Sequence, residues 1–477
     1  MECETIIPEI DNKPGPTDQS DCTNNSSKSD NCKQQSVVDS RITSILTSRY
    51  HLSGVQLQII ASSQFSSLEL NLLEHALLPK IGWTDPYLES FLLKLSLLDK
   101  FPTSGLGERE GRIFSSLVSK RHYHFAHGIG RSGDLLEWQP KAPGSSLLYR
   151  LTNRLLLNFA RQILNWSVQA AIVMPTATGM AIFFAIKALA LPCKSKVIWL
   201  RADQKSAIKA INLAGYQTVV LEGLWIQEQL ETDIQALERA IEAGDIAAVI
   251  STTSCFAPRS CDDIVAISKL CQKHQLPHLI NNAYGLQSPY LNSQVQSALV
   301  SGRVDAVIQS GDKNFLIPVS CAIIYGPLST AASIGNIYPG RASGSGIIDL
   351  FLSLLHLGID GWNGLVQERL GLFNLLKTEL KARNISWYQT PKNDISLALK
   401  LPDPSLGPML FARGISGVRS VQPRTQCICG HEFVNWNAHS SHSCSSYCNV
   451  AIALGCRLPE INNFLAKLDK VVQKQDH

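Results

Sequence analysis

The sequence predicts an α/β protein with a mainly parallel sheet that helices cover on both faces. Two observations support this prediction. Between residues 169 and 325, short apolar runs of strand-forming residues alternate with amphipathic stretches of helical period, which is the pattern of strands joined by crossover helices. The chain has 477 residues, of which 45% are hydrophobic, so it is long enough to form two or three globular lobes.

Six short apolar runs are the expected strands: Ala171 to Met174, Val197 to Leu200, Ala247 to Ser251, His278 to Asn281, Ala306 to Gln309 and Ala322 to Tyr325. Helical patterns lie between several of them, at Gln204 to Ala214, Glu228 to Ala243 and Asp262 to His274. The longest apolar run, Met180 to Pro192, contains Lys187 and is too short to cross a bilayer. We therefore expect a buried helix there and no membrane role.

Residues 1–40 differ in composition from the rest of the chain. They are rich in Ser, Asn, Asp, Thr and Gln, and they carry eight acidic residues against three lysines. Because few large apolar side chains are present to bury, we expect a disordered, acidic low-complexity tail. The tail has neither the arginines of a mitochondrial presequence nor the apolar core of a secretory signal. Most of the thirteen cysteines are scattered singly, which favours reduced thiols and a cytoplasmic location.

Polar or small residues follow five of the expected strands, and in a parallel sheet these strand ends share one edge, where ligands bind. Lys313 lies in the loop after the run Ala306 to Gln309. A lysine held there against a mostly apolar wall loses part of its preference for the charged form, and it can then condense with an aldehyde. The alternative for any single lysine is a solvated loop residue.

The segment around Ala177 and Thr178 leads from the first strand directly into a helix, so its free N–H groups form an anion site at the positive helix end. An ordinary capping turn is the alternative. Gln204 and Asn282 follow two further strands and belong to the same predicted pocket. Together with Lys313, these residues predict a pyridoxal phosphate site.

A dense polar block precedes the sheet, and its run from His127 to Asp134 combines three glycines with Arg131 and Ser132. Glycine lets backbone N–H groups approach an anion closely, and a guanidinium can bind two phosphate oxygens at once. We therefore predict a second phosphate site, distinct from that of the cofactor; a glycine-rich surface turn is the alternative. The block has no P-loop lysine pattern, which argues against nucleotide hydrolysis.

Several cysteines and histidines gather near the C-terminus: Cys427, Cys429, His431, His439, His442, Cys444 and Cys448. Their side chains could bind zinc. The spacing Cys-x-Cys-x-His lacks the two-residue gap of a standard zinc finger, so we expect no metal site.

Several long motifs, in order from about Ile81 to the C-terminus, resemble those of the O-phosphoseryl-tRNA(Sec) selenium transferase family. The motifs are Gly-Glu-Arg-Glu-Gly-Arg (107–112), His-Gly-Ile-Gly-Arg-Ser-Gly-Asp (127–134), Gln-Pro-Lys (139–141), Ser-Thr-Thr-Ser-Cys-Phe-Ala-Pro-Arg (251–259), Asn-Asn-Ala-Tyr-Gly (281–285), Asp-Lys-Asn-Phe (312–315) and Tyr-Pro-Gly-Arg-Ala-Ser (338–343). Several unusual motifs in one order are far more specific than any single one.

The resemblance implies the fold type I architecture of pyridoxal phosphate transferases, with a seven-stranded sheet. It also implies a homotetramer whose active sites lie at subunit interfaces. The expected organisation is the tail at 1–40, a helical N-terminal assembly region with the substrate phosphate loop at 41–150, a large cofactor-binding domain at 151–350 and a small α/β domain at 351–477.

The resemblance further implies the last step of selenocysteine biosynthesis, a reaction on phosphoserine carried by selenocysteine tRNA. Lys313 would hold pyridoxal phosphate and remove the α proton, phosphate would leave from the β carbon, and selenophosphate would supply selenium. By motif, the substrate phosphate would be bound by Arg131, Ser132, Gln139 and Arg341. Arg109 would contact the cofactor, and Glu108 would repel the α-carboxylate of free phosphoserine.

Three residues qualify this expectation. Most enzymes of this fold type place a carboxylate against the pyridine nitrogen, whereas the matching strand end carries the neutral Asn282. A weaker electron sink suffices when phosphate is the leaving group, which favours β-elimination over transamination or decarboxylation. Arg419 matches a family position at the tRNA acceptor end, but Val300 stands where the family has a basic residue.

Two alternatives remain open. The first is another enzyme of the same fold, such as a cysteine desulfurase, which would need a mobile catalytic cysteine. The second is a catalytically idle tRNA-binding or scaffold subunit. The joint presence of the lysine and of the phosphate-type residues argues against loss of the catalytic pocket.

Overall fold

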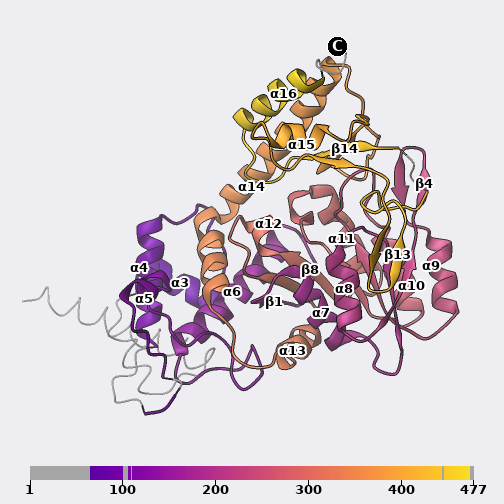
Figure 1. Ribbon diagram of the computed structural model, residues 1–477. Helices are drawn as coiled ribbons and strands as arrows, with labels where there is room; N and C mark the ends of the chain where they lie inside the picture. The colour runs from indigo at the N-terminus through magenta and orange to yellow at the C-terminus, as the bar shows by residue number, and fades with distance from the viewer. Residues whose placement is uncertain (1–64, 100–105, 109, 443–444, 473–477) are drawn as a thin grey trace, which may run out of the picture.

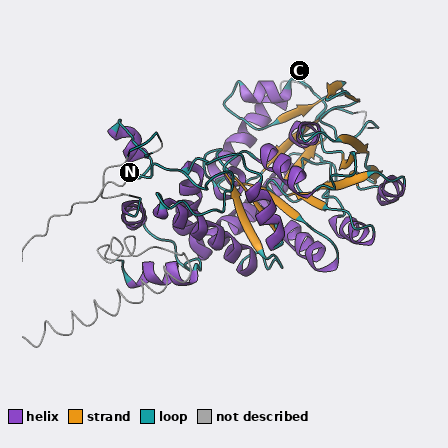
Figure 2. Ribbon diagram, turned by 90° about the horizontal axis from the view of Figure 1, so that it is seen from below, coloured by secondary structure: helices purple, strands orange, loops and turns teal. Residues whose placement is uncertain are grey.

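The computed structural model describes residues 65–99, 106–108, 110–442 and 445–472. They form a three-layer α/β unit with a helical region on one side and a smaller lobe made by the C-terminal part of the chain (Figure 1). Figure 2 shows the central strands lying between helices on both faces. The expected tail, residues 1–40, lies outside the described residues.

The central sheet has seven strands in the order β1-β9-β8-β7-β6-β2-β3. The strands are β1 (Ala170–Met174), β2 (Lys196–Leu200), β3 (Gln217–Leu221), β6 (Ile246–Thr252), β7 (His278–Asn281), β8 (Ala306–Ser310) and β9 (Ala322–Gly326). β9 runs antiparallel to both of its neighbours, and every pair from β8 to β3 is parallel. The predicted mainly parallel sheet of seven strands is confirmed.

Helices cover this sheet: α6 (Pro143–Gln162), α7 (Thr178–Leu189), α8 (Lys205–Leu213), α9 (Ile234–Glu242), α10 (Ile264–Lys273), α11 (Pro289–Ser301), α12 (Gly311–Phe315) and α13 (Leu328–Asn336). Strands β1, β6, β7, β8 and β9 are buried along their whole length. Burial on both faces explains why these strands are continuously apolar in the sequence. The largest hydrophobic core lies between these layers.

Three helices, α3 (Ser67–His75), α4 (Asp85–Leu97) and α5 (Ser116–Arg121), belong to the N-terminal region, and α4 packs against α6 and the long α14 (Ser345–Ala382). α14 bends at Gly358, whose φ is 59°. A Cβ at this position would lie 2.8 Å from the carbonyl oxygen of Pro79, so only glycine fits here. Beyond the bend, α14 leads into the C-terminal lobe.

The C-terminal lobe has an antiparallel sheet in the order β10-β14-β11. Its elements are β10 (Ser396–Leu399), α15 (Leu406–Phe411), β11 (Arg419–Val421), β14 (Tyr447–Ala451) and α16 (Leu458–Val472). These elements and the second half of α14 enclose a separate hydrophobic core. Two hairpins complete the chain, β4 (Leu224–Ile226) with β5 (Gln229–Glu231), and β12 (Gln426–Ile428) with β13 (His431–Phe433).

The hydrophobic pattern predicted the wrong secondary structure in two places. The helix predicted for Glu228 to Ala243 is wrong at its start, because β5 forms a hairpin with β4 and α9 begins only after Asp233. The Asp233 carboxylate accepts a hydrogen bond from the N–H of Ala236 at 2.8 Å and so fixes the helix start. The edge strand β3 was missed, since it begins with a polar residue and is only half-buried.

Among the described residues, no helix combines the length and the apolar character that crossing a bilayer requires.

Candidate active site

Lys313 follows β8, as the sequence predicted, but it lies in the short helix α12 and not in a loop. The neighbouring Asn314 fixes this helix, because its Nδ2 donates to the carbonyl oxygens of Ala283 at 2.9 Å and Ser310 at 2.8 Å. The Lys313 side chain is exposed in this chain, with Nζ 5.6 Å from the ring centroid of Tyr284. The expected apolar wall is therefore limited to one aromatic ring, and the amine is open to a ligand.

Asn282 follows β7, the strand next to β8, and its side chain is fully buried. Its Oδ1 accepts a hydrogen bond from Thr253 Oγ1 at 2.5 Å, while its Nδ2 has no hydrogen-bond partner among the described residues. Gly285 permits this arrangement, since a Cβ there would lie 1.8 Å from Asn282 Oδ1. An unpaired buried donor is costly, so Asn282 Nδ2 is well placed to donate to a ligand acceptor.

The N-terminus of α7 follows β1 at the place where the sequence predicted an anion site. Ala177 is the N-cap residue, no side chain caps the helix, and the first N–H groups of Thr178 and Gly179 remain available. A Cβ on Gly179 would lie 3.2 Å from Ser206 Cβ, so the starts of α7 and α8 are close neighbours. Two helix N-termini at one place favour a bound anion.

Gln204 is the N-cap residue of α8. Its Oε1 lies 3.5 Å from Asn281 Nδ2, and its Nε2 lies 3.8 Å from Cys255 Sγ. The ends of β2, β6 and β7 therefore meet at Gln204. The buried Thr176 Oγ1 and Tyr284 Oη also have no hydrogen-bond partner among the described residues. Burial raises the pKa of the Tyr284 phenol well above its ordinary value, so this group is a neutral donor.

The predicted substrate phosphate loop is a tight turn, in which the N–H of Arg131 donates to the carbonyl oxygen of Asp134 and the reverse bond is also present, each at 2.9 Å. Ser132 has a φ of 52°. Both Arg131 and Ser132 are exposed, and Arg131 Nη1 lies 3.6 Å from Glu137 Oε1. The Arg131 guanidinium therefore remains accessible to an anion. Gln139 is buried, and its Oε1 accepts from the N–H of Lys141 at 3.3 Å.

Arg341 lines a pocket of about 370 Å³ together with His127 and Ser145. The phosphate loop reaches this pocket because Ile129 and Ala342 exchange two backbone hydrogen bonds of 3.0 Å. Burial and the nearby Arg341 lower the pKa of His127. Arg131 and Arg341 thus belong to one side of the molecule.

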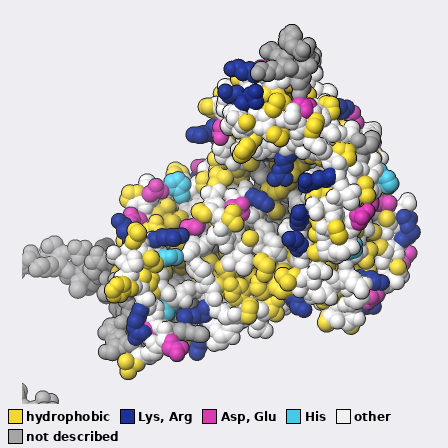
Figure 3. Space-filling view, viewed as in Figure 1, with side chains coloured by type: hydrophobic (Ala, Val, Ile, Leu, Met, Phe, Trp, Pro, Cys, Tyr) yellow, Lys and Arg dark blue, Asp and Glu magenta, His cyan; other side chains and the backbone are white. Residues whose placement is uncertain are grey.

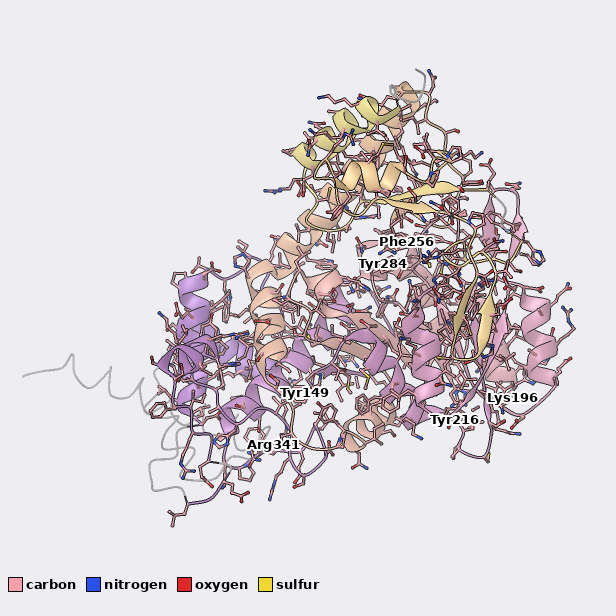
Figure 4. All side chains as sticks on the ribbon, viewed as in Figure 1. Tyr149, Lys196, Tyr216, Phe256, Tyr284 and Arg341 are labelled. Carbon is pink, nitrogen blue, oxygen red and sulfur yellow. The ribbon has the colours of Figure 1, made fainter. Side chains whose placement is uncertain are left out.

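The structure does not bring this phosphate side and the lysine together within one chain. Figure 4 shows Arg341 near the lower edge of the molecule and Tyr284, which lies beside Lys313, near the upper opening of the sheet domain. Glu108 is exposed, and Arg109 lies outside the described residues. Arg419 is exposed in the C-terminal lobe, with its guanidinium 4.6 Å from the ring centroid of Phe256. Val300 is also largely exposed.

Sequence reasoning missed a buried network that joins the C-terminal lobe to the sheet. Asp203 accepts hydrogen bonds from Arg201 Nε and from the N–H of His439, both at 2.8 Å. Arg201 also donates to Glu222 at 2.6 Å. Arg201 and Asp203 follow β2 at the ligand edge of the sheet, but their side chains hold the loop after β13. The only signal in the sequence was the presence of polar residues at the end of a strand. Their partner, the loop that contains His439, is more than 200 residues away in the sequence.

His439 lies against Cys255, with Nε2 3.6 Å from Sγ, while its Nδ1 accepts from the N–H of Asp203 at 2.9 Å. Burial lowers the pKa of His439 to about 4 and raises the pKa of Cys255 to about 11. Both groups are therefore neutral at pH 7. Cys427 and Cys429 are exposed on the β12–β13 hairpin, and no metal-binding group of three such side chains occurs among the described residues.

Two buried histidines make stability depend on pH. Burial lowers the pKa of His278 and of His439 from 6.5 to about 4. The stability they confer is complete above pH 6.5 and is lost as pH falls toward 4, because the unfolded chain binds protons first. We expect His278→Gln to reduce the loss of unfolding free energy between pH 7.5 and pH 5 by about 2 kcal/mol.

Urea unfolding at the two pH values measures this difference. Asp99 has the opposite effect on the pH dependence of stability, since burial raises its pKa to about 6. Its contribution is the same in wild type and in His278→Gln, so it does not affect the difference between them. The exposed His442 provides the control as His442→Gln. Equal pH dependence in wild type and His278→Gln would show that His278 is not a source of acid sensitivity.

Comparisons with known proteins agree with this geometry. Residues 97–473 match the family model "O-phosphoseryl-tRNA(Sec) selenium transferase, SepSecS". The chain is 39% identical over 464 residues to O-phosphoseryl-tRNA(Sec) selenium transferase of Dictyostelium discoideum, an alignment that covers 89% of this chain and 97% of the relative. The protein of the same name from Methanopyrus kandleri is 35% identical over 414 residues, covering 84% and 94% respectively.

Among solved structures, archaeal O-phosphoseryl-tRNA(Sec) selenium transferase matches with a TM-score of 0.77 and 28% identity, over 95% of this chain and 100% of that structure. Ureidoglycine-glyoxylate aminotransferase of Bacillus subtilis (TM-score 0.53, 12% identity, 78% and 95% covered) and a cysteine desulfurase of Thermococcus onnurineus (0.52, 12%, 69% and 86%) share the fold alone. The fold type I prediction is confirmed. The chain belongs to the O-phosphoseryl-tRNA(Sec) selenium transferase family, whose members are transferases.

Proposed function

We propose that this chain converts O-phosphoseryl-tRNA(Sec) to selenocysteinyl-tRNA(Sec) with selenophosphate, and that it does so as a cytoplasmic homotetramer that binds pyridoxal phosphate. The observation that carries the proposal is the arrangement at the strand ends. Lys313 is exposed at the end of β8, and the unpaired Nδ2 of Asn282 lies at the end of the adjacent β7. The family match supplies the substrate.

The residues present fit pyridoxal phosphate. The free N–H groups at the start of α7 suit its phosphate, Asn282 Nδ2 can donate to its ring nitrogen, and Lys313 can hold its aldehyde carbon. Thr176 Oγ1 is a further unpaired group at this edge. When bound, pyridoxal phosphate supplies an electron sink for charge that develops at the α carbon of an amino acid.

The side chains of the protein then have separate tasks. Lys313 removes the α proton of the phosphoseryl group. Arg131 and Arg341, with Ser132 and Gln139, bind the substrate phosphate and stabilise the charge that grows on it as the bond between the β carbon and oxygen breaks. Selenium from selenophosphate then adds to the β carbon of the double bond that remains, Lys313 returns a proton to the α carbon, and hydrolysis of the selenium–phosphorus bond gives the selenol. Glu108 selects the esterified substrate by repelling a free carboxylate.

Within one chain, Lys313 and the phosphate loop lie on different sides of the molecule. We therefore infer that Lys313 of one subunit acts together with the phosphate loop of another. Exposed apolar side chains support assembly: Leu106, Phe114 and Leu117 are each at least 75% exposed. Figure 3 shows a broad apolar patch on the lower part of the sheet domain. Large exposed apolar surfaces typically mark protein–protein contacts. Light scattering should give about four times the mass of one chain, 52.3 kDa.

The surface that we propose for RNA binding is basic, as an acidic substrate requires. Figure 3 shows Lys and Arg side chains around the hollow between the C-terminal lobe and the sheet domain. Arg419 lies in this region, and we propose that it contacts the acceptor end of the tRNA. A cysteine desulfurase is disfavoured, because Cys255, which lies beside Gln204 of the proposed cofactor site, is buried and neutral.

The direct test is incubation of the purified protein with phosphoseryl-tRNA(Sec) and selenophosphate. The visible spectrum, the release of phosphate and the selenium attached to RNA should all be followed. A cofactor absorption band with both products supports the proposal. A band without turnover would contradict the assigned substrate, and the absence of a band would favour a scaffold subunit.

Arg131→Ala is expected to raise the KM for phosphoseryl-tRNA(Sec) by roughly 10- to 100-fold, because a charge-assisted hydrogen bond to phosphate contributes about 1.5–3 kcal/mol. Arg131 is exposed, so the fold should not change. Arg424→Ala, another exposed arginine outside the phosphate loop, serves as the control. Steady-state kinetics with an unchanged KM would remove Arg131 from the phosphate site.

Asn282→Asp is expected to lower the rate of phosphate elimination by about tenfold or more, since a buried carboxylate can only accept and would change the charge on the ring nitrogen. Single-turnover phosphate release measures this rate. The exposed Asn384→Asp is the matched control. An unchanged elimination rate would show that Asn282 does not face the cofactor ring.

A further inference from the structure

A second large pocket lies between the C-terminal lobe and the sheet domain, and it has a volume of about 670 Å³. Its lining comes from the loop 414–419, from the end of β14 and the segment after it (450–452 and 454–456), from α16 and from Phe256 of the sheet domain. The hollow seen in Figure 3 lies where Figure 4 labels Phe256 and Tyr284. None of the roles assigned above uses this pocket beyond Arg419 at its edge.

The pocket adjoins the catalytic lysine by two routes. Along the first, Lys313 Nζ lies over Tyr284, the rings of Tyr284 and Phe256 are 6.3 Å apart, and Phe256 lines the pocket. Along the second, Leu316, three residues after Lys313, packs against Gly455, where an added Cβ would be 3.5 Å from Leu316 Cδ1. A group bound in this pocket is therefore separated from Lys313 by a single layer of side chains.

The chemistry of the lining suits a flat, uncharged ring with polar edges. Ile415, Val418 and Phe464 provide apolar walls. The ring of Phe256, with the Arg419 guanidinium stacked over it at 4.6 Å, provides a stacking surface. The exposed amide of Asn463 stands at the edge of the pocket. The volume lies within the roughly 300–1,000 Å³ of small-molecule sites and exceeds the needs of a phosphate.

We infer that this pocket binds the terminal nucleoside of the RNA substrate, with its base between the apolar walls and its ester-bearing ribose directed toward Lys313. The inference rests on the proposed function, because in an aminoacyl-tRNA the terminal ribose carries the amino acid. When the amino acid reaches Lys313, its nucleoside must lie next to it. The base thus fixes the distance between RNA and lysine, which a charged surface alone cannot do.

Two RNAs test this inference. One is a fluorescent acceptor-stem hairpin that ends in unpaired CCA, and the other is the same hairpin whose terminal nucleotide has lost its base. We expect the wild-type protein to bind the intact hairpin about tenfold or more tightly, as expected for one stacked base. Ala451→Trp fills the pocket from an exposed position in its lining, and it should bind both hairpins equally.

The matched control is Ala453→Trp, since Ala453 is exposed two residues away and does not line the pocket. It should retain the preference for the intact hairpin. If Ala451→Trp lowers the melting temperature, Ala451→Leu provides a smaller filling group. Equal binding of both hairpins by wild type would overturn the inference, and so would an undiminished preference in a folded Ala451 variant.

Turnover separates this inference from the proposed function. A preference for the terminal base without phosphate release from phosphoseryl-tRNA(Sec) would support the pocket and refute the reaction. Phosphate release with equal binding of the two hairpins would support the reaction and refute the pocket.

Discussion

Lys313→Ala is expected to slow phosphate release from phosphoseryl-tRNA(Sec) by at least about a thousandfold, because it removes both the attachment point of the cofactor and the base that takes the α proton. The visible absorption band of the bound cofactor should also be lost or shifted.

The fold should tolerate this change. The Lys313 side chain is exposed, and α12 is held by the two hydrogen bonds of Asn314 and by the buried Phe315. Melting temperatures of wild type and variant should therefore agree. Lys381→Ala, at an exposed position of α14, is the control and should retain full activity. Undiminished turnover in Lys313→Ala would exclude the assigned chemistry.

Mixing the inactive Lys313→Ala variant with the weakly binding Arg131→Ala variant is expected to raise activity at low substrate above that of either variant alone. Lys313→Ala leaves the phosphate loop intact, and Arg131→Ala leaves the lysine intact. If each active site takes Lys313 from one chain and Arg131 from another, a mixed oligomer contains some sites in which both residues are wild type. The separation of the lysine and Arg341 within one chain is the structural reason for this expectation (Figure 4).

The two variants should be unfolded together and refolded, or coexpressed with different tags, and the mixed oligomer should be purified through both tags. Its turnover at low substrate is then compared with that of each variant alone. A mixture of Lys313→Ala with Asn282→Ala is the control, because both residues belong to one set of strand ends and no mixed site is intact. A purified mixed oligomer that is no more active at low substrate than Arg131→Ala alone would place Arg131 and Lys313 in the same chain.

The sequence by itself determined the central strands and the place of the lysine. Strands buried on both faces must be continuously apolar, so runs such as Ala306 to Gln309 stand out without knowledge of their neighbours. A polar segment after such a strand lies at the ligand edge of the sheet, which located Lys313 and Asn282. The half-buried β3 and the short β5 carry weaker patterns, because edge strands and hairpins need fewer apolar residues.

Only the tertiary structure decided which polar residues serve the site and which serve the fold. Arg201 and Asp203 follow a strand like Asn282 does, yet they bind the loop that contains His439, more than 200 residues away. The spacing of residues in a sequence does not specify such distant partners. The separation of Arg341 from Lys313 was likewise decided by packing, which places Arg341 near the lower edge of the molecule and Tyr284, beside Lys313, near the upper opening of the sheet domain (Figure 4).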